Sequence, residues 1–161
     1  MKKILIISTS GTFNKVYNPI SGNLDIDKNS IAIENIAKNW LTNFNIINII
    51  GKDSLDMNDN DRKKIVQIIK NSSYNKIVIV HGTDTMDKTA RYLHHNILDK
   101  TIVLTGAMVP FSINPIEATA NLASALGYIK NLNQNGIFIV MNGAMDSHNK
   151  VIKNREKGYF E

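Results

Sequence analysis

The 161-residue sequence contains no cysteine, only three prolines and a single tryptophan. The absence of cysteine excludes a disulfide framework and a thiolate nucleophile, so covalent catalysis would have to use a hydroxyl or an amine. The amino-terminal apolar run, residues 4–7, ends after four residues at a polar serine. Such a run is too short for the core of a signal peptide and for a membrane span. We therefore expect a cytoplasmic protein with no membrane partner.

The sequence also lacks a block of lysine or arginine, although its formal net charge is +5 and its pI is near 9.4. A protein that follows a phosphate backbone usually gathers its basic residues on one stretch or face, whereas here they are scattered. The abundance of Asn, Ile and Lys is typical of a codon-biased genome, which explains the basic balance without a partner. We therefore expect no nucleic-acid partner.

Neither GxxxxGK[ST] nor GxGxxG occurs, which argues against a nucleotide enzyme. No group of histidines and carboxylates has the spacing of a metal site, so we expect neither a metal nor a cofactor. His94 and His95 are adjacent, so on a helix their side chains should diverge and lie at the surface. His81 is interpreted as the support of a turn, and His148 is near enough to Lys153 in sequence to approach the same site.

Five short apolar runs, rich in Ile and Val and without alternation, predict strands that are buried on both faces of a sheet. Helical patterns lie between them in residues 58–71 and 115–131, and Ile116 is expected on the apolar face of the second. This alternation predicts an open, doubly wound α/β domain over residues 1–161, with a mainly parallel sheet of about five strands and helices on both faces. The five runs are residues 4–7, 46–50, 77–80, 102–104 and 137–141.

Polar side chains collect where the predicted strands end, and ligands bind beyond the carboxyl ends of parallel strands. Taken singly, each of these hydroxyls and carboxylates could be a helix N-cap. However, Thr12 does not lead promptly into a helical pattern, and Thr83, Asp84 and Thr85 supply more polar groups than one cap can use. The long polar segment of residues 9–28 is interpreted as a lid or a disordered excursion. The polar segments are residues 9–12, 53–56, 82–85 and 105–107.

Three of these segments carry recognisable motifs, which are TSGT at 9–12, HGTDTM at 81–86 and TGAM at 105–108. In this order and at these intervals they resemble the amino-terminal domain of the bacterial-type L-asparaginase and glutaminase family. The resemblance covers nearly the whole chain, and the HGTDTM hexapeptide is specific to that family. Counting on from Asn142 without a gap places Lys153 where the family's catalytic lysine is expected.

The resemblance implies that the protein hydrolyses the side-chain amide of asparagine, or of a related small amide, to the acid and ammonia without a cofactor. Thr12 would attack the amide carbon to give an acyl-enzyme, and Tyr17 would help to take its proton. Thr83, Asp84 and Lys153 would form a relay that orients a water or supplies a competing nucleophile. The roles of the two threonines stay open.

The same resemblance implies how the substrate is held. Asp84 would bind the α-ammonium group, and Ser54 would donate to the α-carboxylate. Backbone groups near Thr83 and Ala107 would contact the reacting amide as preorganised donors. These residues, together with the catalytic set, make up the predicted site.

The sequence also departs from the family pattern. Ser10 replaces a common glycine, Val109 a common arginine, and Leu55 a glutamine that often contacts substrate. We expect the family's carboxyl-terminal domain to be absent, and in the family a neighbouring subunit's copy of that domain supplies an acidic group. We expect a short, single-domain relative that assembles as a homodimer or homotetramer. Two functions remain open: an amidohydrolase, or a small-molecule binding module with little or no turnover.

Overall fold

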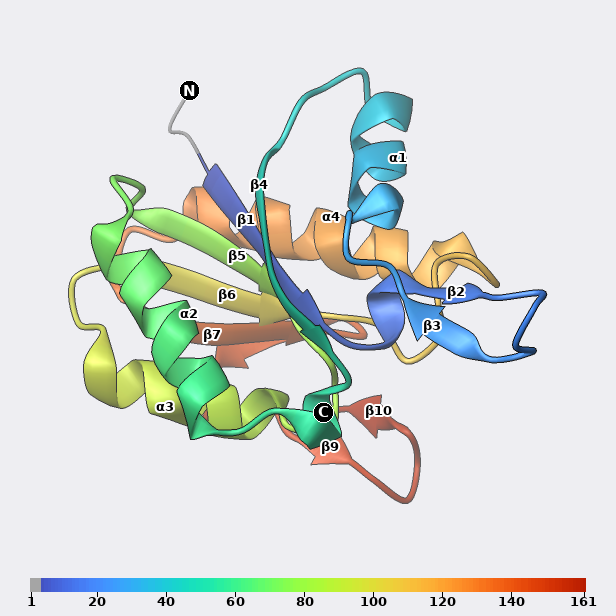
Figure 1. The fold of residues 1–161 in the computed structure, drawn as a ribbon. Helices are drawn as coiled ribbons and strands as arrows, with labels where there is room; N and C mark the ends of the chain where they lie inside the picture. Colours follow the sequence, from blue (N-terminus) through green and yellow to red (C-terminus); the bar gives the residue numbers. More distant parts are fainter. Residues whose placement is uncertain (1–3) are drawn as a thin grey trace.

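The computed structural model describes residues 4–161 and places a six-stranded sheet at the centre of the molecule (Figure 1). Five strands run parallel in the spatial order β4-β1-β5-β6-β7, and β8 pairs antiparallel with β7. The predicted mainly parallel sheet is confirmed. The short strand β8 was not predicted, because its sequence AMDS has no apolar run. The strands are β1 (Ile4–Ser10), β4 (Asn45–Lys52), β5 (Lys76–Val80), β6 (Thr101–Thr105), β7 (Gly136–Met141) and β8 (Ala144–Ser147).

Helices cover both faces of this sheet (Figure 1). Successive residues of a strand point to opposite faces, so Leu5 and Ile7 of β1 pack under α2 and α3, whereas Ile6 packs under α1 and α4. Both faces of β1 are therefore apolar, which is why its run shows no alternation. The helices are α1 (Ile31–Asn39), α2 (Asp59–Asn71), α3 (Met86–Asn96) and α4 (Pro115–Asn131).

The two helices that the periodicity predicts begin at recognisable caps. Asn58 forms a capping box with Asp61 at the start of α2, and α4 begins at a proline that follows an asparagine cap. The expectation for Ile116 is wrong, because its side chain is 74% exposed. The buried face of α4 includes Ala118 and Leu122, and a residue two positions before Ala118 lies about 200° around the helix.

The run at residues 46–50 was wrongly predicted to be buried on both faces. Its strand, β4, lies at the edge of the sheet, and Ile47 is exposed. Its register with β1 shifts near the carboxyl end, where Ile50 and Gly51 have φ of 71° and 68°. Such a bulge bends a strand, and here it leads the chain into the loop that carries Ser54.

The segment of residues 9–28 forms a turn and a hairpin, so the disordered alternative is wrong. After a 3₁₀ turn (Thr12–Asn14), β2 (Lys15–Tyr17) pairs with β3 (Leu24–Ile26), and this hairpin projects beyond the sheet (Figure 1). Lys15 Nζ lies 2.8 Å from Asp53 Oδ2, which ties the base of the hairpin to the loop after β4. This ion pair also holds the pKa of Asp53 below its usual value.

A second hairpin, made of β9 (Lys153–Asn154) and β10 (Tyr159–Phe160), follows β8. It lies beside the carboxyl ends of the parallel strands and brings Lys153 there. Within residues 4–161, no helix is both long and apolar enough to cross a bilayer.

Candidate functional site

Neighbouring strand ends meet through close backbone contacts at glycines. Gly11 has a φ of 91°, and a Cβ atom added to it would lie 2.2 Å from the Cα of Gly82. A Cβ atom added to Gly82 would in turn lie 2.6 Å from Ser54 Oγ. The loops after β1, β5 and β4 are therefore in direct contact. Because Thr12 and Thr83 follow the two glycines directly, they lie at the same edge of the sheet.

Lys153 contacts two of the polar residues that follow β5. Its Nζ donates to Thr83 Oγ1 at 2.9 Å and to Asp84 Oδ1 at 2.8 Å. The side chain of Lys153 is only 12% exposed, and that of Asp84 is 36% exposed. A lysine within hydrogen-bond reach of a hydroxyl can exchange a proton with it, which is the arrangement that an activated hydroxyl needs. The structure thus brings Thr83, Asp84 and Lys153 together.

Arg155 is a fourth member of this cluster, and the sequence analysis missed it. Its Nη2 donates to the Asp84 carbonyl oxygen at 2.8 Å, and its Nη1 lies 3.5 Å from Asp84 Oδ1. Arg155 begins the turn between β9 and β10, so no strand or helix periodicity in the sequence links it to Lys153. The Asp84 carboxylate therefore faces two cations.

Thr12 lies half-buried in the 3₁₀ turn, between the hairpin and the strand ends. Its neighbours Phe13 and Asn14 are buried and anchor the turn, whereas the Thr12 hydroxyl makes no hydrogen bond within residues 4–161. Tyr17 lies further along on β2, and its side chain is 63% exposed. In the described chain Tyr17 has no hydrogen bond to the Lys153 cluster, so the structure does not bring it to those residues.

Two of the three predicted binding residues, Ser54 and Ala107, are buried. Ser54 begins a 3₁₀ turn (Ser54–Asp56), and its carbonyl accepts a hydrogen bond from Thr85 Oγ1 at 2.8 Å. Thr85 occupies the N-cap position of α3, yet its side chain makes no capping bond and instead ties two loops together. Ala107 follows Gly106, where an added Cβ would lie 2.3 Å from the His81 carbonyl oxygen. The loop after β6 therefore packs directly against the loop after β5.

His81 supports the turn after β5, as predicted. Its ring is fully buried, with Nδ1 2.7 Å from the Gly82 carbonyl oxygen and Nε2 2.9 Å from Thr89 Oγ1. Burial, helped by the positive charge of Arg62, lowers the pKa of His81 to about 4. The ring is therefore neutral at pH 7 and has a structural role.

We expect His81 to destabilise the fold as the pH falls. Its pKa is about 4 in the folded state against 6.5 for an ordinary histidine, so the unfolded chain binds a proton first and stability is lost between those values. The full difference corresponds to about 3 kcal/mol. Urea unfolding near pH 7 and near pH 4.5 should show a smaller acid loss in His81→Gln than in the wild type.

The exposed His95 on α3 provides the control for this measurement. His95→Gln should lose as much stability on acidification as the wild type does. An equal loss of stability on acidification in the wild type and in His81→Gln would contradict the lowered pKa of His81.

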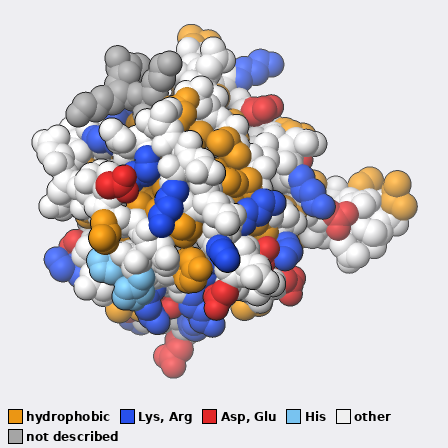
Figure 2. Space-filling model, turned by 60° about the vertical axis from the view of Figure 1, so that its left-hand side comes forward, with side chains coloured by type: hydrophobic (Ala, Val, Ile, Leu, Met, Phe, Trp, Pro, Cys, Tyr) orange, Lys and Arg blue, Asp and Glu red, His pale blue; other side chains and the backbone are white. Residues whose placement is uncertain are grey.

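The other three histidines gather on the surface, where pale blue side chains lie together in Figure 2. The ring centroids of His94 and His95 are 5.7 Å apart, and those of His94 and His148 are 4.8 Å apart. The surface positions of His94 and His95 are confirmed, but their rings do not diverge, since they lie edge to face. His148, which follows β8, lies against the ring of His94. Partial burial, and then the charges of these neighbours and of Arg91, lower the pKa of His148. Among residues 4–161, no group of histidines and carboxylates could hold a metal ion.

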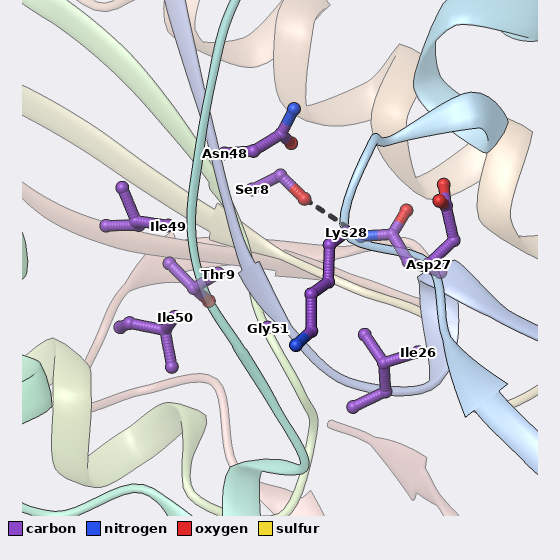
Figure 3. Close-up of a pocket in the computed structure, with 10 residues that line it drawn as sticks. Ser8, Thr9, Ile26, Asp27, Lys28, Asn48, Ile49, Ile50 and Gly51 are labelled. Atoms are coloured by element: carbon purple, nitrogen blue, oxygen red, sulfur yellow. Dashed lines mark hydrogen bonds between the residues drawn. The ribbon is translucent and has the colours of Figure 1, made fainter.

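Two cavities lie near the carboxyl ends of the strands. One, of about 310 Å³, is lined by Thr83, Lys153, Arg155 and His148, among others, so His148 does approach the cluster. The other, of about 140 Å³, lies between β1, β4 and the end of β3 (Figure 3). Figure 3 shows the side chain of Lys28 extending toward Gly51, and none of the predicted site residues lines this cavity. The first cavity therefore adjoins Thr83 and Lys153 of the candidate site, and the second is separate from it.

Comparison with known proteins gives one family. The family model described as "Asparaginase, N-terminal" matches residues 3–159. Among curated proteins, the chain is 31% identical to the probable periplasmic L-asparaginase of Haemophilus influenzae, covering 88% of this chain and 43% of that protein. It is 26% identical to the glutaminase-asparaginase of Acinetobacter glutaminasificans, covering 93% and 49%. The chain thus spans about half the length of the curated relatives that it matches.

Solved structures agree with these matches. The thermostable L-asparaginase from Thermococcus kodakarensis superposes with a TM-score of 0.85 at 25% identity, over 99% of this chain and 50% of that one. A probable cytoplasmic L-asparaginase from Campylobacter jejuni gives a TM-score of 0.78 at 28% identity, over 96% and 50%. The similarity therefore covers nearly the whole of this chain and half of each relative.

Proposed function

Since the chain belongs to the asparaginase family, we propose that it is an L-asparaginase-like amidohydrolase that converts a small side-chain amide to the acid and ammonia. The observation that carries the proposal is the placement of Lys153 Nζ, 2.9 Å from the Thr83 hydroxyl and 2.8 Å from the Asp84 carboxylate. A site that only binds a ligand has no need of a partly enclosed lysine held against a hydroxyl.

In the proposed reaction, Thr12 Oγ attacks the amide carbon to form an ester, and the C–N bond breaks. The nitrogen leaves as ammonia with the proton that the Thr12 hydroxyl gives up. Water then hydrolyses the ester and restores that hydroxyl. Thr83, held by Lys153, would pass the proton or serve as the competing nucleophile, and Tyr17 on the hairpin would approach Thr12 when substrate binds.

The binding groups follow the same proposal. Asp84 would lie beside the position of the substrate's α-ammonium group, and Ser54 would donate to the α-carboxylate. Backbone groups beside Thr83 and Ala107 would stabilise the oxyanion that develops on the amide oxygen. The contacts between the loops after β4, β5 and β6 support this placement, because these loops carry the four residues and meet at one edge of the sheet.

The direct test is ammonia release by the purified protein from asparagine, glutamine and other small ω-amides. The Thr12→Ala variant serves as the blank, and Thr42→Ala, which changes an exposed threonine outside the site, serves as the matched control. Release that disappears only in Thr12→Ala would support the proposal. No release from any amide by the folded wild-type protein would contradict it.

The alternative is a small-molecule binding module, which would need only the polar groups at the strand ends. It would bind an amino acid at the same strand ends without releasing ammonia. Calorimetry with aspartate beside the ammonia assay separates the two functions, because an amidohydrolase must give ammonia whereas the module gives binding alone.

Assembly and location are further parts of the proposal. Members of the family are typically oligomeric, so a homodimer or homotetramer is proposed, and light scattering after size-exclusion chromatography tests it. The Campylobacter relative is described as probably cytoplasmic, which supports the same location for this chain.

A further inference from the structure

We propose that Arg155 makes this site select ω-amides that lack an α-ammonium group, such as the monoamides of dicarboxylic acids. The inference rests on the proposed amidohydrolase function and names its substrate class. Arg155 acts through Asp84, so it is a positioning residue that sets specificity.

The Asp84 carboxylate is flanked by two cations, Lys153 and Arg155. Its Oδ1 accepts a hydrogen bond from Lys153 Nζ at 2.8 Å and lies 3.5 Å from Arg155 Nη1. Arg155 is fixed further by donating to the Asp84 carbonyl oxygen at 2.8 Å. One carboxylate is thus shared by two cations, and the three side chains together carry a formal charge of +1. A substrate ammonium group placed beside Asp84 would be repelled by this net charge.

Thr83, Lys153 and Arg155 help to line a cavity of about 310 Å³. Its wall also includes Arg91, whereas Asp87 is the one carboxylate among its lining residues. A cavity lined mainly by one sign of charge attracts small ions of the opposite sign. The surroundings of Thr83 therefore favour a substrate with a net negative charge.

Asparagine and a dicarboxylic acid monoamide differ in net charge. Asparagine carries an ammonium and a carboxylate and is neutral overall, whereas succinamate has the same chain length and only the carboxylate. Its amide can be hydrolysed in the same way, giving succinate and ammonia. Succinamate therefore lacks the ammonium group that Arg155 would repel and keeps the carboxylate that would bond to Ser54.

The exposed side chain of Leu55 agrees with this choice. It follows Ser54 in the 3₁₀ turn and is 70% exposed. An aliphatic side chain offers no hydrogen bond to an ammonium group.

The test compares kcat/KM for succinamate with kcat/KM for asparagine. The wild type should prefer succinamate, and Arg155→Gln should lower the ratio about five-fold, the size expected for a partly exposed charge. Arg155→Lys should keep most of the preference, because it keeps the charge. The matched control is Lys157→Gln, which removes the same charge from the same hairpin, where Lys157 pairs with Glu161 instead of Asp84.

Binding of the products tests the inference separately from turnover. Calorimetry should show tighter binding of succinate than of aspartate, and Arg155→Gln should remove that difference while Lys157→Gln keeps it. A wild type that prefers asparagine or aspartate, or a ratio unchanged by Arg155→Gln, would overturn the inference. Absence of ammonia release together with the expected binding preference would contradict the proposed function but would still support the role of Arg155.

Discussion

Replacing Lys153 with methionine should reduce ammonia release by about 10³-fold or more, as expected when a group that moves a proton in the reaction is lost. Lys153 is the only partner that the structure gives the Thr83 hydroxyl within residues 4–161. Without it, that hydroxyl has no group beside it that can exchange a proton. The measurement is steady-state ammonia release by the wild type and the variant at equal protein concentration.

The fold should survive the same change. Methionine preserves most of the aliphatic stem, and Asp84 keeps its contacts with Arg155, so the loss should be about 1 kcal/mol, or roughly 2–4 °C in thermal midpoint. Lys150→Met is the matched control, since Lys150 is exposed, pairs with Asp146 and should be dispensable for turnover. Undiminished release by a folded Lys153→Met protein would remove Lys153 from the mechanism.

The sequence predicts the central part of the fold because buried strands have a strong signal. The runs that became β1, β5, β6 and β7 are apolar on both faces, and that pattern led directly to a parallel sheet. The same pattern gave a wrong prediction of burial for β4, because an edge strand can be rich in isoleucine and still leave a residue such as Ile47 exposed. The hairpin after Thr12 was not predicted for another reason. Its three-residue strands are mostly exposed, so hydrophobic periodicity cannot reveal them.

The candidate site was predictable where motif and geometry coincide. Thr83 and Asp84 lie in one hexapeptide, and Lys153 joins them as expected from its place after Asn142. Arg155 was missed because its importance lies in a contact across the fold, from the last hairpin to the Asp84 carbonyl oxygen. A lone exposed arginine in a sequence gives no sign of such a partner. The role of Tyr17 remains a prediction. Its side chain is exposed on the hairpin, so it would have to approach Thr12 when substrate binds.

Replacing Gly11 with alanine should destabilise the protein by about 3 kcal/mol or more, the range of a severe backbone defect. The residue has φ of 91° and ψ of −176°, a region that is essentially restricted to glycine. The new Cβ would also lie 2.2 Å from the Cα and 2.6 Å from the N of Gly82. Backbone atoms cannot move aside as a side chain can, so the loops after β1 and β5 must separate. Urea unfolding measures the loss directly.

Gly22→Ala separates the two causes of this effect. Gly22 also has a positive φ, 74°, but an added Cβ would meet no atom within 4 Å, so only backbone strain of about 1–2 kcal/mol is expected. The excess loss in Gly11→Ala then measures the contact between the loops together with the more restricted backbone conformation of Gly11. That contact keeps Thr12 near Thr83, so Gly11→Ala should also lose turnover under conditions where it is still folded, whereas Gly22→Ala should retain it. A folded Gly11→Ala protein with full activity would show that catalysis does not depend on holding the two threonine loops together.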